Sequence, residues 1–328
     1  MYCTGIAHAH RVPQKLPGTV WGITAFFNPC GYATYLENYR VFRKKSAGQG
    51  LRLVAVELVF GEQQFVLQSG DADILVQIRG GDVLWQKERL LNVALRHLPS
   101  DCDKVVILDT DVLFERDDWL AQVKEKLEEY MVVFPFSHLI RLPKGLQQHT
   151  GQRCRFGFGE DEMCHSFGFG FSRYGMAGTR LFRKHGVTGG AVAVRRWLLD
   201  KHGLYDADIT GAGDVIFAQA CVGNTNYMRL KRMSRKQKEH ARQWSYCMAK
   251  DVRQSIGYVD GVALHLWHGT QANRRYSQRH EMLYTENFDP LKDISLHRSG
   301  AWQWASPKER LHRACREYFS SRRDDVYT

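Results

Sequence analysis

The chain has 328 residues, of which 44% are hydrophobic and 25% charged, a balance typical of a globular protein that excludes a disordered or fibrous one. No stretch reaches the ~18 to 20 apolar residues that a membrane span needs, so we expect no transmembrane association. The N-terminal stretch "MYCTGIAHAHRVPQKLPG" lacks the apolar centre of a secretion signal, which favours a cytoplasmic protein.

The formal net charge of +11 indicates a positive field that attracts polyanions such as nucleic acid, nucleotide phosphates or anionic membranes. Eight cysteines are scattered without a Cys-x-x-Cys pair, so they are predicted to be reduced thiols, with neither a disulfide framework nor a zinc site. The composition therefore predicts an intracellular protein with an anionic partner.

The first half of the chain alternates β-branched runs with amphipathic segments. The predicted strands are residues 19–27, 52–60, 73–78, 104–114 and 130–136. The predicted helices between them are residues 32–47 and 82–99. This alternation predicts an α/β fold with a central, mostly parallel sheet flanked by helices.

The second half is less regular. Residues 143–186 are rich in Gly and Phe without a clear period, and we predict a mobile loop or lid there. Residues 229–253 carry nine Lys or Arg against two acids, which predicts a basic face. No clean linker occurs, so we expect one domain over 1–285 and an Arg-rich helical extension over 286–328.

Paired acids end the apolar run "KVVILDTDVLF", where Asp109 and Asp111 stand one residue apart. Ligands of α/β sheets bind beyond the carboxyl ends of the strands. Two carboxylates at this spacing suit Mn²⁺ or Mg²⁺, one as a direct ligand and the other holding a water or a ligand hydroxyl. A solvated strand end is the structural alternative.

The sequence "VQIRGGDVLWQKERLLNVALRHL" followed by "KVVILDTDVLF" resembles the donor half of GT-A glycosyltransferases, especially the β-1,4-galactosyltransferase type. In that type an aromatic and a basic residue precede "KLLNVG", and an Asp-x-Asp strand follows. The resemblance covers roughly residues 20–285. It implies the GT-A fold, a UDP-sugar donor and a divalent metal.

By this resemblance, Trp85 would stack on uracil, Lys87 would approach the diphosphate, Asp109 would meet the ribose or the metal, and Asp111 would ligate the metal. Thr24, on the first predicted strand, is included among the donor-binding residues. The alternatives are a core aromatic for Trp85 and a solvated helix residue for Lys87.

Two glycines and an acid follow in the order of that family. In "VTGGAVAVRR", Gly189 and Gly190 would let the backbone approach the donor sugar. In "DITGAGDVIFAQA", Asp214 falls on the family's proposed general base for an inverting transfer, with Asp208 in reserve. A helix N-cap is the alternative for Asp214.

This segment also departs from the family. Gly213 replaces the family's Glu, and Thr210 stands where the family has an acceptor-binding Trp. Recognition of a sugar acceptor by the family's pattern is therefore not implied.

The segment "LHLWHGTQANRRYSQRHEML" resembles the one in which a histidine completes the metal shell. His268 matches best and His265 is the alternative. Arg274 and Arg279 would clamp a diphosphate, or else pair with surface acids.

The same segment, with "FDPLKDI", "WQWAS" and "REYFSSRR", also resembles the phage and bacterial TET/JBP-associated glycosyltransferases. That resemblance implies a hydroxymethylated pyrimidine in DNA as acceptor and the cytoplasm of a bacterium or phage-infected host. The basic charge over 229–253 is typical of a surface that contacts phosphates, and a solvated basic face is the alternative. The alternatives are a cytoplasmic transferase acting on surface polysaccharide, lipid-linked saccharide or protein, and a scaffold with an inactive transferase fold.

Overall fold

The computed structural model describes residues 10–151, 154–157, 159–225, 232–270, 272–275 and 278–326, and for residues 178–185 it describes the backbone alone. Parts of two predicted segments therefore lie outside the described residues. They are residues 152, 153 and 158 of the predicted lid and residues 229–231 of the basic segment.

A seven-stranded sheet runs through the centre of the molecule in the order β12-β6-β11-β4-β1-β2-β3. Its strands are β1 (Thr19–Phe27), β2 (Leu53–Val59), β3 (Ile74–Arg79), β4 (Cys102–Leu108), β6 (Val132–Phe134), β11 (Ala191–Arg195) and β12 (Ile256–Tyr258). All neighbours are parallel except β11, which is antiparallel to both β4 and β6. The predicted mostly parallel central sheet is confirmed.

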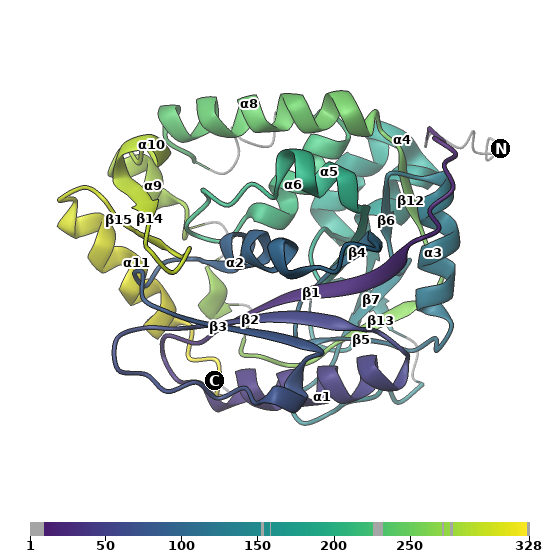
Figure 1. Cartoon of the computed structure of the whole chain (residues 1–328), viewed down its shortest axis with the longest axis horizontal. Coiled ribbons are helices and arrows are strands. Elements are labelled where there is room, and N and C mark those ends of the chain that lie inside the picture. The colour runs from purple at the N-terminus through teal and green to yellow at the C-terminus, as the bar shows by residue number, and fades with distance from the viewer. Residues whose placement is uncertain are drawn as a thin grey trace.

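Helices cover both faces of this sheet (Figure 1). They include α1 (Ala33–Gly48), α2 (Lys87–Ala94), α3 (Trp119–Glu129), α5 (Arg196–His202), α6 (Gly213–Cys221) and α8 (Arg235–Val252). α1 lies on one face, and α2, α5, α6 and α8 lie on the other. The strands alternate accordingly: Ile23 and Val54 join the core beneath α2, whereas Leu53 packs with Phe42 of α1. The α/β fold class is therefore confirmed.

A second sheet lies beside the first, in the order β10-β9-β7-β13-β5 with β8 paired to β9. Its strands are β5 (Val112–Phe114), β7 (His138–Arg141), β8 (Arg155–Phe156), β9 (Glu162–Ser166), β10 (Gly186–Val187) and β13 (Val262–His265). Residues 104–114, predicted as one strand, are thus divided between β4 of the first sheet and β5 of the second. Asp109, Thr110 and Asp111 link the two, because Asp is poorly suited to a strand interior.

Residues 143–186, for which we predict a mobile loop or lid, contain regular elements, and their mobility stays a prediction. The segment contains β8, β9 and α4 (Phe167–His185), a helix that is kinked at Gly175, where φ is 55°. Phe167 and Phe171, four residues apart, pack in the core with Phe134. The aromatic spacing in this segment is therefore that of a buried helix face.

The predicted helical extension over 286–328 also contains a small sheet. Its elements, after α9 (Glu281–Thr285), are α10 (Pro290–Asp293), β14 (Ile294–Leu296), β15 (Trp302–Trp304) and α11 (Glu309–Ser321). Short 3₁₀ turns occupy Ser69–Asp71, Leu95–His97 and Ala272–Arg274. Trp302 forms two hydrogen bonds with the loop before α2. Its carbonyl accepts one of 3.0 Å from the Asp82 amide, and its amide donates one of 2.9 Å to Gln86 Oε1. The extension is therefore hydrogen-bonded to the loop between β3 and α2. No helix within the described ranges is long and apolar enough to cross a membrane.

Candidate active site

A cavity of about 190 Å³, lined by both apolar and charged side chains, opens beside the carboxyl ends of β1 and β4. Such an edge is where ligands of α/β sheets bind. The predicted site residues that line this cavity are Trp85, Lys87, Asp109, Asp111, Asp214, His265, His268, Arg274 and Arg279. Side chains from distant parts of the sequence therefore converge on one volume.

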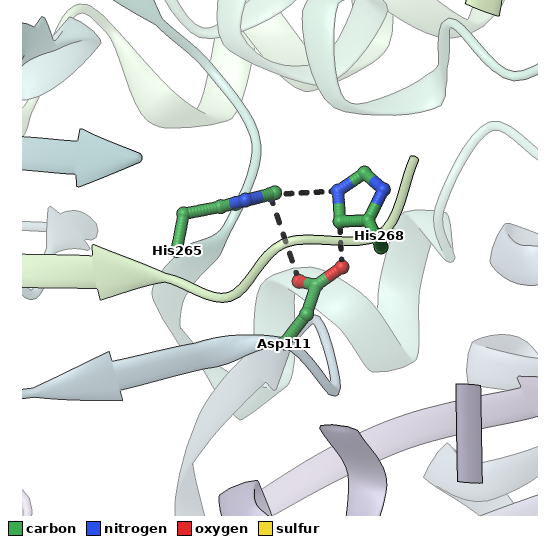
Figure 2. A group of neighbouring side chains, drawn as sticks. All are labelled: Asp111, His265 and His268. Atoms are coloured by element: carbon green, nitrogen blue, oxygen red, sulfur yellow. Dashed lines mark hydrogen bonds and ion pairs between the residues drawn. The ribbon is translucent and has the colours of Figure 1, made fainter. Parts of the chain in front are cut away.

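Asp111, His265 and His268 form a compact cluster on one side of the cavity, pointing toward one another in Figure 2. The nearer Asp111 carboxylate oxygens lie 3.3 Å from His268 Nε2 and 3.7 Å from His265 Nε2. The two Nε2 atoms are 3.2 Å apart. The sequence left the two histidines as alternatives, and the structure brings both together.

This cluster fits a divalent metal. One potential ligand atom from each residue lies within 4.8 Å of the others. Within this cluster, Asp111 Oδ1 is buried and has no hydrogen-bond partner among the described residues. Burial, reinforced by Arg141 and Arg274, lowers the pKa of His265 to about 3, which keeps its imidazole neutral and able to coordinate. One carboxylate and two imidazoles suit Mn²⁺ better than Mg²⁺.

Asp109 is engaged differently. It forms an ion pair with Lys87, and its Oδ2 accepts a 3.1 Å hydrogen bond from the Gly190 amide. Burial by itself lowers the pKa of Lys87, but the carboxylates of Asp109, Glu88 and Asp214 outweigh it and hold that pKa above its ordinary value. The three-residue cluster does not include Asp109. Its predicted role as a metal ligand is therefore not supported, and a donor-facing role remains.

Asp214 lies in the first turn of α6, where the helix dipole favours a negative charge. Its Oδ2 accepts a hydrogen bond of 2.9 Å from the Thr188 hydroxyl. A Cβ at Gly189 would lie 2.8 Å from the same oxygen, so Gly189 leaves the space that this carboxylate occupies. Gly190 adopts a φ of 91°, which favours glycine. Both predicted glycines line a smaller pocket beside the cavity, which shares Lys87, Asp109 and Asp214 with it.

Two other predicted residues do not face the cavity. Thr24 is completely buried, and its hydroxyl donates to the Leu108 carbonyl at 2.8 Å. Asp208 is almost completely buried, and its Oδ1 accepts from the amides of Thr210 and Gly211 and from the Thr210 hydroxyl. We conclude that Thr24 is not placed to bind a donor, because its hydroxyl is committed to a carbonyl. Asp208 organises a turn through Oδ1, and its Oδ2 is buried without a hydrogen-bond partner among the described residues.

Trp85 forms a wall of the cavity and is half-buried. Its ring stacks with Phe319 at 6.3 Å and meets Phe27 edge-on at 5.6 Å. A Cβ at Gly211 would lie 2.9 Å from the indole ring. The indole is thus packed against protein groups, and stacking on uracil stays a prediction that would use only its remaining exposed surface.

Glu88 is a cavity residue that sequence reasoning missed. Glu88 is 6% exposed and accepts a 3.0 Å hydrogen bond from Trp85 Nε1. A Cβ added at Gly213 would lie only 2.3 Å from the Glu88 carboxyl carbon. The absence of a side chain at position 213 therefore makes room for this carboxyl group. One pattern could have revealed it: Glu88 precedes Leu91 by three positions, which places an acid on the apolar face of α2.

Burial raises the pKa of Glu88 to about 8, with Lys87 acting in the opposite direction and Asp214 and Asp208 adding to the rise. In the unfolded chain this carboxyl titrates near its ordinary value of 4.5. Between these two values the folded protein holds a proton that the unfolded chain has lost. The stability contributed by Glu88 is therefore present below pH 4.5 and lost as the pH rises toward 8.

We expect Glu88→Gln, which stays neutral, to lose this pH dependence. At pH 8 the variant should exceed the parent protein in free energy of unfolding by up to about 4 kcal/mol, since each pKa unit is worth about 1.4 kcal/mol. Urea unfolding at pH 5, 6, 7 and 8 measures the difference, with Glu125→Gln at an exposed position as control. A constant difference across this range would contradict the assignment of a buried, protonated Glu88.

Three guanidinium groups, from Arg274, Arg279 and Arg322, line the side of the cavity near α11. Arg279 donates to the Tyr318 hydroxyl at 3.0 Å and to the Gly211 carbonyl, and Arg274 donates to the His268 carbonyl. All three residues are less than 10% exposed, which contradicts pairing with surface acids for Arg274 and Arg279. Sequence reasoning missed Arg322 because its segment follows the predicted domain and resembles a peripheral extension.

No family model and no curated protein matches the chain. Among solved structures, it is similar to Staphylococcus aureus TarS in complex with UDP-GlcNAc, with a TM-score of 0.39, 11% identity, and coverage of 92% of this chain and 72% of that one. It is also similar to glucosyl-3-phosphoglycerate synthase from Mycobacterium tuberculosis in complex with Mn²⁺, UDP and phosphoglyceric acid. The TM-score is 0.40 and the identity 13%, and the match covers 85% of this chain and 82% of that one. A third similar structure is the catalytic domain of Drosophila β1,4-galactosyltransferase 7 in complex with xylobiose. Its TM-score is 0.36 and its identity 11%, and the match covers 90% of this chain and 98% of that one. These are distant likenesses of fold, so the activity has to be argued from the cavity.

Proposed function

We propose that the protein is a metal-dependent glycosyltransferase of the GT-A type that moves a sugar from a UDP-sugar to a hydroxyl acceptor. The observation that carries the proposal is one cavity that holds a metal-fitting cluster, several cationic side chains and a carboxylate on a separate element. A nucleoside diphosphate needs the first two, and activation of a hydroxyl needs the third. The resemblance of the sequence to GT-A enzymes supports the same reading.

The donor would lie between the Asp111–His265–His268 cluster and the three arginines. A divalent metal held by that cluster would neutralise charge on the diphosphate and stabilise it as the leaving group. Guanidinium groups complement phosphate oxygens in a bidentate manner. Lys87 adds a positive charge beside Asp109, whose other contacts leave it facing the same volume.

Asp214 would act as the general base. Its carboxylate is oriented by Thr188 and lines the cavity, so an acceptor hydroxyl bound beside it would lose its proton to this group as it attacks the anomeric carbon. Attack on the side opposite the diphosphate gives inversion. The Gly189 and Gly190 backbone would border the sugar.

For the acceptor we propose a hydroxymethylated pyrimidine in DNA, on the sequence resemblance and on the basic face of α8. Arg235, Lys236, Arg242 and Lys250 are exposed on that helix. No residue of α8 lines the cavity, and α8 packs on α6, so this face would contact phosphates away from the reacting base. A surface polysaccharide, a lipid-linked saccharide or a protein is the second candidate acceptor, because the described residues that line the cavity form no feature restricted to a nucleobase.

The test incubates the protein with Mn²⁺, labelled UDP-glucose or UDP-galactose, and duplex DNA that contains hydroxymethyl-pyrimidines. We expect label in DNA, none in matched DNA without the hydroxymethyl group, and loss of labelling with EDTA. Label found only on saccharide, lipid or protein from a lysate would support the second acceptor class. An absence of UDP-sugar binding by calorimetry would contradict the proposed function itself.

A further inference from the structure

The chain returns to the cavity immediately after α11, through the segment Arg322–Asp325, which we call the return segment. Arg322 lines the cavity and is 3% exposed, and Asp324 is completely buried. The next residue in sequence after Arg322, Arg323, is exposed. The segment thus directs one of two consecutive arginines into the site and the other into solvent.

Carboxylates of the return segment fix its position. Asp325 accepts hydrogen bonds of 2.9 and 3.0 Å from the amides of Ala33 and Thr34 at the start of α1, and one of 2.7 Å from the Thr34 hydroxyl. Negative charge at that helix end is also favoured by the dipole. The return segment is therefore attached to α1, which covers the face of the main sheet opposite to α2 and α6.

Asp324 holds two guanidinium groups side by side. Its Oδ1 lies 3.2 Å from Arg274 Nη2, and its Oδ2 lies 2.9 Å from Arg322 Nε. The Tyr35 hydroxyl also donates to Oδ2 at 2.9 Å. The Asp324 carboxylate thus holds Arg274 and Arg322 next to each other, and both arginine side chains line the cavity.

We propose that the return segment completes the diphosphate side of the cavity by supplying Arg322, which Asp324 holds beside Arg274 and which lines the cavity with Arg274 and Arg279. The three guanidinium groups border the same cavity as the Asp111–His265–His268 cluster, so one anion can contact both. Planar guanidinium forks match phosphate oxygens in geometry as well as charge. The proposal deepens the proposed function and rests on it for the identity of the ligand as a nucleoside diphosphate.

A purely structural role makes a different prediction. If Arg322 served only to anchor the return segment through Asp324, its loss would loosen the wall of the cavity as a whole. Binding of the nucleoside part of the ligand would then fall together with binding of the phosphates, and the melting temperature would drop. Comparing ligands with and without phosphates separates the two roles.

The experiment measures binding of inorganic pyrophosphate, UDP and uridine to the full chain by calorimetry, with EDTA present so that no metal contributes. Three variants are compared with the parent protein: Arg322→Gln, Arg322→Lys and, as matched control, Arg323→Gln. We expect Arg322→Gln to weaken pyrophosphate and UDP at least tenfold and to leave uridine unchanged. Arg322→Lys should lose less, because it keeps the charge but not the fork, and Arg323→Gln should behave as the parent.

Unchanged pyrophosphate binding in Arg322→Gln would overturn the proposal, as would an equal loss for uridine accompanied by a lower melting temperature. The outcome for the proposed function is read separately. Pyrophosphate binding that depends on Arg322, with no preference for UDP and no UDP-sugar turnover, would retain the anion site and reject the transferase. UDP-sugar turnover that is unchanged in Arg322→Gln would retain the transferase and reject Arg322 as part of the anion site.

Discussion

Replacing Asp214 with Asn is expected to lower sugar transfer by about 10²- to 10⁴-fold, the range that a positioned general base supplies. The amide keeps the size of the carboxylate and can still pair with Thr188, but it cannot take a proton from the acceptor. Donor affinity should change little, because Asp214 faces the acceptor in the proposed mechanism. The measurement is the turnover of labelled UDP-sugar together with the UDP-sugar dissociation constant from calorimetry.

Asp200→Asn, at an exposed position on α5, controls for the general effect of removing an acid. We expect it to retain both turnover and affinity. If the Asp214→Asn variant instead lost its affinity for the donor, Asp214 would be a binding residue. The base would then have to be another group, and Asp208 could not replace it because its carboxylate is buried in the turn at Thr210 and Gly211.

Asp111→Asn is expected to abolish metal-dependent turnover while the protein stays folded. The amide would supply a weaker, uncharged ligand between two imidazoles, and Mn²⁺ affinity should fall by at least about 100-fold, since loss of a group that only supports a ligand already costs 10- to 100-fold. Electron paramagnetic resonance of Mn²⁺ titrated into the protein measures the free ion directly. Thermal unfolding without metal checks that the variant is folded.

His268→Ala should reproduce the loss of Mn²⁺ binding, whereas His138→Ala, on β7 and outside the cluster, should not. Mn²⁺ affinity and turnover that survive in Asp111→Asn would sink the assignment of the metal site. Survival in His265→Ala alone would reduce the site to Asp111 and His268.

The elements that sequence predicted well are those with local patterns. Residues 19–27 are rich in β-branched and aromatic residues, and they form β1 with the same bounds. Asp109, Asp111 and Asp214 could be placed at one site because the first two follow a strand and the third lies at the start of a helix, in the order of a known family. The roles of these residues remain predictions, but their convergence is a property of the structure.

The remainder depended on contacts between distant segments. Glu88 and Arg322 reach the cavity because Gly213 leaves space for one and the return segment carries the other. An acid on the apolar face of α2 is a local sign of Glu88, but the space at Gly213 and the path of the return segment have no local pattern. Thr24 was placed on the correct strand, but its side chain points to the Leu108 carbonyl. Residue type and strand position alone do not decide whether a polar group faces a ligand or another part of the backbone.

The change of sheet between Asp109 and Asp111 has a consequence for how the metal site depends on strand pairing. The Asp111 carbonyl accepts a 2.7 Å hydrogen bond from the Leu266 amide, and Val112 of β5 pairs directly with His265 of β13. The Asp111 carboxylate and the His265 imidazole are therefore neighbours across the antiparallel pairing of β5 with β13. A shift of β13 by a single residue would turn His265 to the opposite face of the second sheet, and it would leave the first sheet and Asp109, which follows β4, in place. The site's ability to hold an ion thus rests on the register of one short strand pair.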